Sequence, residues 1–131
     1  MGKQQVAQKE QSKAQAAQRQ RQGEIVRAIL DQWAEVMVAN GERTPEQGPF
    51  LAIDAWAEWT ESTRAWEDLR ETLLSLAASS EETQVLESFF PPSGPTRACV
   101  EICKLADQLV YNRQLSEAAA RWRVIQEGLT S

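Results

Sequence analysis

Histidine is absent from this chain of 131 residues. Histidine is the most frequent general base and metal ligand in proteins, and catalytic triads that use an imidazole require it. The six glycines are scattered, and none lies in the closely spaced pattern of a phosphate-binding loop. These absences count against a metalloenzyme, a triad hydrolase and a nucleotide-binding enzyme. We therefore expect a protein that is not an enzyme and that uses no cofactor or small-molecule substrate.

Cysteine is scarce as well, since Cys99 and Cys103 are the only two. They lie four positions apart in a segment with the pattern of a helix, which places both side chains on one face. Two sulfur atoms without histidine are too few for a structural metal site, which usually has four protein ligands. We expect two small core residues in a reducing compartment, with no metal bound.

Long hydrophobic runs are also missing. No stretch approaches the ~20 apolar residues that cross a bilayer, and the N-terminal residues lack the apolar centre of a signal peptide. The hydrophobic fraction of 42% and the charged fraction of 25% are close to those of globular domains, so the chain should fold. We expect a soluble cytoplasmic protein without membrane contact, and a virion is the alternative location.

Charge is unevenly distributed along the chain. Residues 1–22 contain five basic residues and one acid, a net charge of +4. Residues 23–87 contain fourteen acids and four arginines, a net charge of −10, whereas residues 88–131 carry +1. The basic residues of the first segment are Lys3, Lys9, Lys13, Arg19 and Arg21. This distribution predicts three surfaces that attract different partners.

Residues 1–22 have the composition of a helix without a hydrophobic face. They include eight glutamines and four alanines, with Val6 as the only large aliphatic residue after Met1. Alanine, glutamine, lysine and arginine favour helix, but a helix that is polar on every side has no core to pack against. We interpret residues 1–22 as an arm, either an extended helix or a disordered tail, followed by a single domain over residues 23–131. Because Gly23 costs only about 1 kcal/mol inside a helix, one continuous rod through the arm and the first core helix is compatible with the sequence.

Apolar residues recur three and four positions apart through most of residues 24–127, which is the period of helices packed on one side. Nothing alternates with the period of a strand. The second helix contains a polar patch at residues 60–63, where we expect a bend or a break. The predicted fold is all-α, a bundle of four or five helices with a long, polar, basic N-terminal helical arm. The expected helices run from Ile25 to Met37, Phe50 to Ala78, Ser79 to Phe90, Cys99 to Val110 and Ala118 to Ile125.

Aromatic residues are the candidates for binding anchors. Trp59 and Trp66 fall on the stripe of the second helix that also carries leucines, so we expect them in the core. Trp56 lies at the margin of that stripe. Phe89 and Phe90 are adjacent and cannot both point inward from one helix. The sequence therefore predicts Trp56, Phe89 and Phe90 as partner-binding residues.

Four acids project to one face of the second expected helix, away from its apolar stripe: Asp54, Glu58, Glu61 and Asp68. A row that faces water has little reason for the shifted pKa that a catalytic carboxylate needs. Such a row suits an acidic protein that imitates nucleic acid and blocks a basic groove of a target enzyme. An ordinary solvated face has the same pattern.

Three functions are compatible with these features, and we give them in the order in which the sequence favours them. The first is a subunit for protein–protein interaction or assembly, including a virion component or an assembly chaperone, that binds other chains or copies of itself through helical surfaces. The second is an acidic helical inhibitor or nucleic-acid mimic. The third is a weak, non-specific nucleic-acid contact through the basic arm, which the acidic remainder of the chain would oppose.

Overall fold

The computed structural model describes the backbone of residues 2–109 and 115–128, and the side chains of residues 13–48, 50–109 and 120–128. Within these ranges the chain forms six α-helices and no strand, so the all-α prediction is confirmed. A short 3₁₀ helix, η1 (Gly48–Phe50), precedes the second α-helix. The α-helices are α1 (Gly2–Ala39), α2 (Leu51–Trp59), α3 (Thr63–Leu76), α4 (Ser80–Phe89), α5 (Arg97–Gln108) and α6 (Leu115–Gly128).

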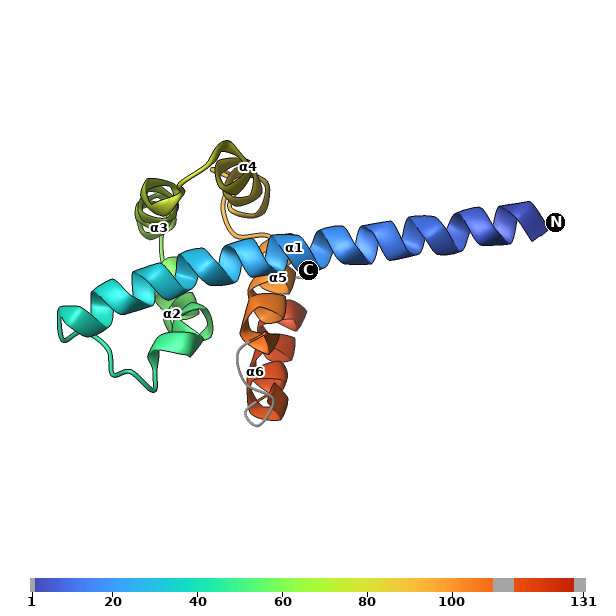
Figure 1. Cartoon of the computed structure of the whole chain (residues 1–131). Helices are drawn as coiled ribbons and strands as arrows, with labels where there is room; N and C mark the ends of the chain where they lie inside the picture. The colour runs from blue at the N-terminus through green and yellow to red at the C-terminus, as the bar shows by residue number, and fades with distance from the viewer. Residues whose placement is uncertain (1, 110–114, 129–131) are drawn as a thin grey trace.

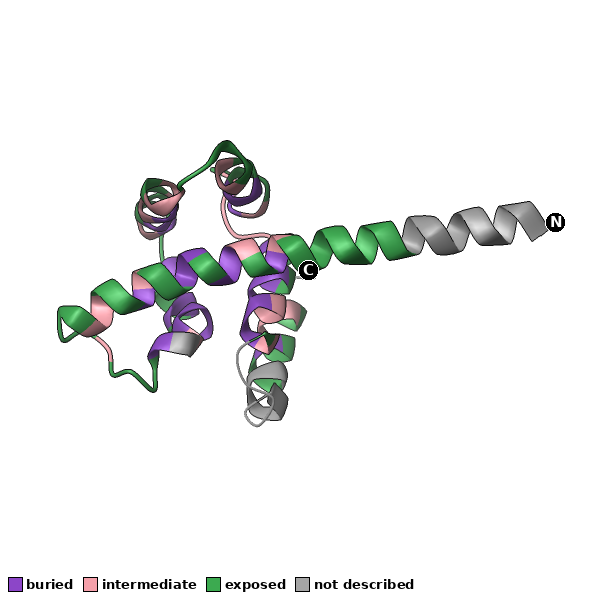
Figure 2. Cartoon of the chain, viewed as in Figure 1, coloured by how far each residue is buried: buried purple, intermediate pink, exposed green. Residues whose placement is uncertain are grey.

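The first helix, α1, is one uninterrupted rod, and the other helices gather around its C-terminal half (Figure 1). Its 38 residues span about 57 Å at about 1.5 Å per residue. Residues 13–21 are exposed and project beyond the rest of the molecule (Figure 2). The packed half provides a helical nucleus, from which residues with high helix propensity continue the rod outward. We call residues 2–22 the arm and the remaining helices the body.

The helix α1 ends at Ala39, and Asn40 and Gly41 follow it. Gly41 has a φ of 77°, a conformation that favours glycine, and its N–H donates to the carbonyl of Val38 at 3.1 Å. The N–H of Glu42 donates to the carbonyl of Met37 at 2.8 Å. These two bonds satisfy carbonyl groups that the helix end would otherwise leave free.

The second helix expected from the sequence is two helices, α2 and α3. Thr60 Oγ1 donates to the carbonyl of Trp56 at 3.0 Å, and the Ser62 side chain accepts a hydrogen bond from the backbone N–H three residues later, which begins a new helix. Serine and threonine end helices in this way because their hydroxyls compete for backbone partners. Ser79 and Thr96 cap α4 and α5 with the same bond. The five expected helices thus become six.

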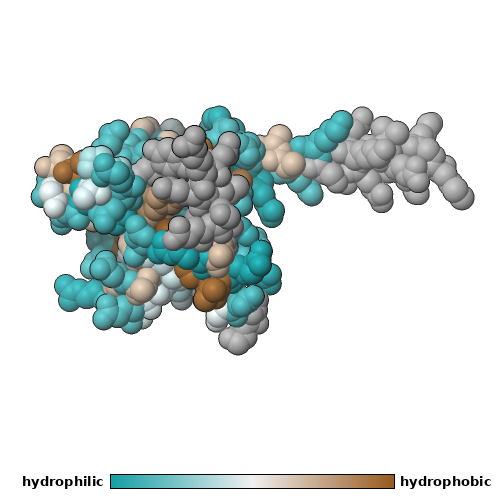
Figure 3. Space-filling model, turned by 90° about the horizontal axis from the view of Figure 1, so that it is seen from below, coloured by the Kyte–Doolittle hydropathy of each residue, from teal (hydrophilic) through white to brown (hydrophobic). Residues whose placement is uncertain are grey.

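The core lies where α1 crosses the other helices, as the buried residues in Figure 2 indicate. Ile29 and Leu30 are fully buried on α1. One turn further, Trp33 stacks on Trp59 of α2, with ring centroids 5.6 Å apart. On the face shown in Figure 3, hydrophilic residues predominate and the hydrophobic areas are small. None of the helices in the described ranges is long and apolar enough to cross a bilayer.

Trp66 of α3 holds the segment that follows α4, at Phe90 and Pro91, against α3. Its ring stacks on Phe90 with centroids 5.9 Å apart, and its Nε1 donates to the carbonyl of Pro91 at 2.6 Å. Arg70 Nε donates to the carbonyl of Phe90. Phe90 is only 1% exposed, so its prediction as an accessible binding anchor is wrong. The reason is that the chain turns inward after α4 and carries this ring into the core.

The prediction that Trp56 is accessible is also wrong. This side chain is 7% exposed and meets Trp122 of α6 edge to face, with centroids 5.7 Å apart. The break after α2 makes this helix short and lets it contact α1, α5 and α6 together. The margin of the apolar stripe of α2 is therefore covered by α6. The apolar period of one helix cannot predict this contact with a distant helix.

The adjacent phenylalanines should respond differently to truncation. Phe90→Ala removes a buried ring and should lower the free energy of unfolding by about 3–5 kcal/mol. Phe89→Ala, at a half-buried position, should lower it by about 1 kcal/mol, because less apolar area leaves water there. Urea denaturation of both variants measures the difference. Equal losses would contradict this assignment of one ring to the core.

Candidate interaction surface at the base of the arm

A buried polar cluster joins α1, α5 and α6. Arg27 Nη1 lies 3.3 Å from Asp107 Oδ1, and Trp122 Nε1 donates to Asp107 Oδ2 at 2.6 Å. Arg27 also pairs with Asp31 one turn along α1, at 2.7 Å. Asp107 is 2% exposed and Arg27 is 7% exposed. This cluster was not predicted, because its members are distant in sequence and no local pattern marks them.

Burial dominates the electrostatics of this cluster. Removal from water raises the pKa of Asp107 from 3.8 to about 6, although the hydrogen bond from Trp122 and the charge of Arg27 lower it. A charge in a poorly solvated place is stable only with close partners, and both carboxylate oxygens of Asp107 have one. The cluster therefore holds α5 and α6 in a defined position against α1.

The two cysteines lie on α5 next to this cluster and are fully buried, as predicted for core residues. A hydrogen bond with Cys99, together with burial, raises the pKa of the Cys103 thiol. The raised pKa favours the neutral thiol of Cys103 over the reactive thiolate. In the described part of the chain, no group of three or more His, Cys, Asp or Glu side chains could hold a metal ion.

Close packing brings α5 against α1 where the arm leaves the body. Gly23 is buried, and a Cβ atom at this position would lie 2.8 Å from Cγ and Cδ2 of Leu105. Such a distance is shorter than real Cβ contacts allow, so glycine permits the approach of the two helices. Position 23 is thus the place where α1 passes from the exposed arm into the packed body.

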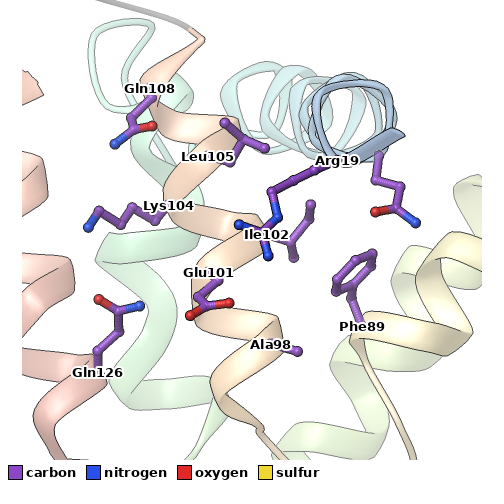
Figure 4. Close-up of a pocket in the computed structure, with 10 residues that line it drawn as sticks. Arg19, Phe89, Ala98, Glu101, Ile102, Lys104, Leu105, Gln108 and Gln126 are labelled. Atoms are coloured by element: carbon purple, nitrogen blue, oxygen red, sulfur yellow. The ribbon is translucent and has the colours of Figure 1, made fainter. Parts of the chain in front are cut away.

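A groove of about 410 Å³ opens beside this contact, between α1, the end of α4 and α5 (Figure 4). The ring of Phe89 faces it, and Ile102 and Leu105 form its apolar wall on α5. Arg19 points from α1 into the same space. The rest of the lining consists of Gln22, Ala98, Glu101, Lys104, Gln108 and Gln126.

The groove combines an apolar wall with cationic and amide groups. Arg19 and Lys104 are its two cations and Glu101 is its one carboxylate among the described lining residues. Glu101 already lies 3.8 Å from Arg97 of the same helix. The described lining contains one aromatic ring and one arginine, and its other residues are aliphatic, amide or charged.

A second groove, of about 570 Å³, lies between α1 and α4. Here Arg21 makes two hydrogen bonds to the carboxylate of Glu81, at 2.9 and 3.2 Å. The hydrogen bond and the charge of Arg21 lower the pKa of Glu81. Because both residues are solvated, this pair orients the arm more than it stabilises the fold.

The predicted acidic row does not form one helix face. Asp54 and Glu58 lie on α2, Glu61 lies in the connection and Asp68 lies on α3, because the helix breaks between them. All four residues are exposed. Asp54 accepts hydrogen bonds from Arg43 at 2.9 Å and from an arginine of α6 at 3.1 Å, so its charge is already engaged.

The basic residues of the arm all lie on α1. Lys13, Arg19 and Arg21 are exposed, and Arg21 is paired with an acid of α4. The side chains of Lys3 and Lys9 lie outside the described residues. Of the three predicted anchors, Phe89 lines the groove described above, which Arg19 also lines. The structure therefore brings together one residue from each of two predicted sets, the aromatic anchors and the basic arm.

No protein-family model, curated protein or solved structure matches this chain. The assignment of a function therefore rests on the geometry and chemistry of the chain itself.

The raised pKa of Asp107 predicts a specific dependence of stability on pH. The folded protein holds the proton of Asp107 more tightly than the unfolded chain does. The contribution of this proton to the free energy of unfolding is therefore greatest below about pH 4 and is lost as the pH rises through about 6. Relative to Asp107→Asn, which does not titrate, the wild-type free energy of unfolding should fall between pH 4 and 7. The change should be of the order of 3 kcal/mol.

Urea denaturation of both proteins between pH 4 and 7 measures this trend. Trp122→Phe is the matched control, because it removes the hydrogen bond that lowers the pKa of Asp107 and should move the transition to higher pH. The opposite trend, with wild type gaining stability over Asp107→Asn as the pH rises, would show that the pairing with Arg27 outweighs burial.

Proposed function

We propose that this chain is a non-enzymatic subunit for protein–protein interaction or assembly, and that partners bind at the base of the arm. The observation that carries the proposal is the form of α1, which continues as an exposed helix beyond the body and forms a groove where it emerges. A helix that leaves its own core gains no stability from packing there. A partner that packs against it supplies the contact that the monomer lacks.

The chemistry of the groove supports a protein partner. Phe89 offers an aromatic face that is only half-buried, and Arg19 offers a guanidinium in the same groove. Arginine and aromatic side chains in a partly enclosed site are the usual energetic centres of protein interfaces. The surrounding glutamine amides suit a polar rim.

The acidic-mimic function remains the alternative. Glu58 and Glu61 are exposed and offer carboxylates to a basic groove, whereas Asp54 is engaged by two arginines. The break between α2 and α3 separates these acids into differently oriented segments, which weakens their resemblance to a regular phosphate backbone. The two functions place the binding residues on different parts of the molecule and can be tested together.

Phe89→Ala and Arg19→Ala should each weaken binding to a partner purified from the native host by about thirtyfold, which corresponds to about 2 kcal/mol. Val124→Ala is the control, because this residue of α6 is 69% exposed and lies outside the grooves at the base of the arm. Calorimetric titration measures the affinities, and thermal denaturation checks that all variants fold. If Glu58→Lys with Glu61→Lys abolishes binding while Phe89→Ala does not, the acidic mimic is the better account.

A further inference from the structure

We propose that the partner of the arm is a second copy of this chain, and that the basic arm of one copy lies along the outward acidic face of α3 of another. This inference names the partner for the interaction function proposed above and rests on it. It arises from three properties of the chain: a basic helix with cations that hold no carboxylate, an exposed acidic helix face whose acids form no ion pair in the described part of the chain, and a rigid connection that keeps the two apart within one molecule.

The arm is basic, and its described side chains form one ion pair within the chain. Residues 1–22 carry a net charge of +4, and residues 13–21 are exposed. Arg21 is paired with Glu81, which leaves Lys13 and Arg19 as the cations of the described arm side chains that hold no carboxylate. Two arms carry the same charge and would repel each other, so an arm–arm contact is disfavoured.

The outward face of α3 carries the complementary charge. Trp66, Leu69 and Leu73 hold one side of this helix in the core. The opposite side is exposed and includes three acids, Glu67, Asp68 and Glu71, with one cation, Arg64, at its N-terminal end, so its net charge is negative. No ion pair involves these three acids in the described part of the chain. They lie at positions i, i+1 and i+4 and therefore form one continuous acidic strip.

The lengths of the two elements fit. Residues 2–22 of α1 span about 31 Å and the 14 residues of α3 span about 21 Å, so the arm can cover the whole strip. The arm already pairs with an acidic helix in its own chain through Arg21 and Glu81, which is the type of contact the proposal requires. Arginine is suited to it because its guanidinium binds a carboxylate through two hydrogen bonds.

The contact must be made between molecules. The arm points away from α3 along the straight axis of α1 (Figure 1), and Gly23 is packed on Leu105 where the body begins. The arm could reach its own α3 only if α1 broke. Reciprocal exchange of arms between two copies gives a closed dimer with twofold symmetry, whereas a one-way contact gives open chains.

A nucleic acid is the competing occupant of the arm. Phosphates also bind lysine and arginine, but residues 23–87 carry a net charge of −10 and would repel a polyanion held at the base of the arm. The same acidic residues attract the arm of a second copy. The charge distribution therefore favours the second copy.

The test is the mass of the full-length protein in solution, measured by light scattering at low and moderate ionic strength. Wild type should show at least twice the monomer mass of 14.7 kDa at low salt and should dissociate as salt screens the contact. The arm-reversed variant, Lys13→Glu with Arg19→Glu, should be monomeric. The strip-reversed variant, Glu67→Lys with Asp68→Lys, should also be monomeric.

An equimolar mixture of the two reversed variants decides the matter, because each arm then meets a strip of opposite charge and association should return. Glu42→Lys with Glu46→Lys is the control; it makes the same change of charge on exposed residues of the loop after α1 and should associate like wild type. A monomeric wild type at low salt, or a mixture that stays monomeric, would overturn the proposal. So would tight binding of a labelled oligonucleotide that depends on Lys13 and Arg19 and competes with association.

These outcomes separate the two proposals. If wild type is monomeric but Phe89→Ala and Arg19→Ala lose the host partner, the interaction function stands and the second copy is excluded. If wild type associates but neither variant affects any partner, self-association stands and the groove is not its binding site.

Discussion

The contact between α1 and α5 fixes the position of everything else in this structure. Two features one helical turn apart define it: the close approach of Gly23 to Leu105, and the buried ion pair between Arg27 and Asp107. A buried ion pair adds little net stability because both groups lose hydration, but it penalises any register that leaves a charge unpaired. Trp122 binds the same carboxylate and so adds α6 to the arrangement. We infer that this cluster determines the register in which α5 and α6 pack on α1, and that most of the folding energy comes from other contacts.

This register determines where the body ends and the arm begins. Gly23 packs on Leu105 of α5 where the body begins, and residues 13–21, which precede it, are exposed and continue the same helix. The same contact places Leu105 and Ile102 beside Arg19, and the end of α4 adds Phe89. The groove is therefore a consequence of how α5 crosses α1. Its walls belong to helices that the ion pair holds in place, so a partner meets a surface that is already ordered.

Much of the fold was predictable from the sequence because its signals are local. The apolar period located the helices, and the polar patch at residues 60–63 marked the break between α2 and α3. The stacking of Trp59 and Trp66 on different partners follows only after that break is known. The acidic row was predicted by projecting residues 54–68 onto one continuous helix. Because the chain breaks between α2 and α3, these acids do not share one helix face.

The remaining features could not be predicted because they depend on contacts between distant segments. Arg27 and Asp107 are separated by 80 positions, and each alone is an ordinary charged residue of an amphipathic helix. Trp56 was assigned to an interface because helix periodicity does not show that α6 covers it. For Phe89 and Phe90, the sequence required that one ring find cover elsewhere, but the turn after α4 decides which one. Phe90 enters the core and Phe89 is left at the groove.

The central claim is that the exposed half of α1 and the groove at its base form the interaction surface. Hydrogen–deuterium exchange of the full chain, free and in its complex, tests it most directly. In the free protein, backbone amides of residues 13–22 should exchange much faster than those of residues 24–38, because only the latter are in the packed half of the helix. In the complex, the amides of residues 13–22 should become protected. Protection confined to other segments, with residues 13–22 exchanging as fast as before, would contradict the account.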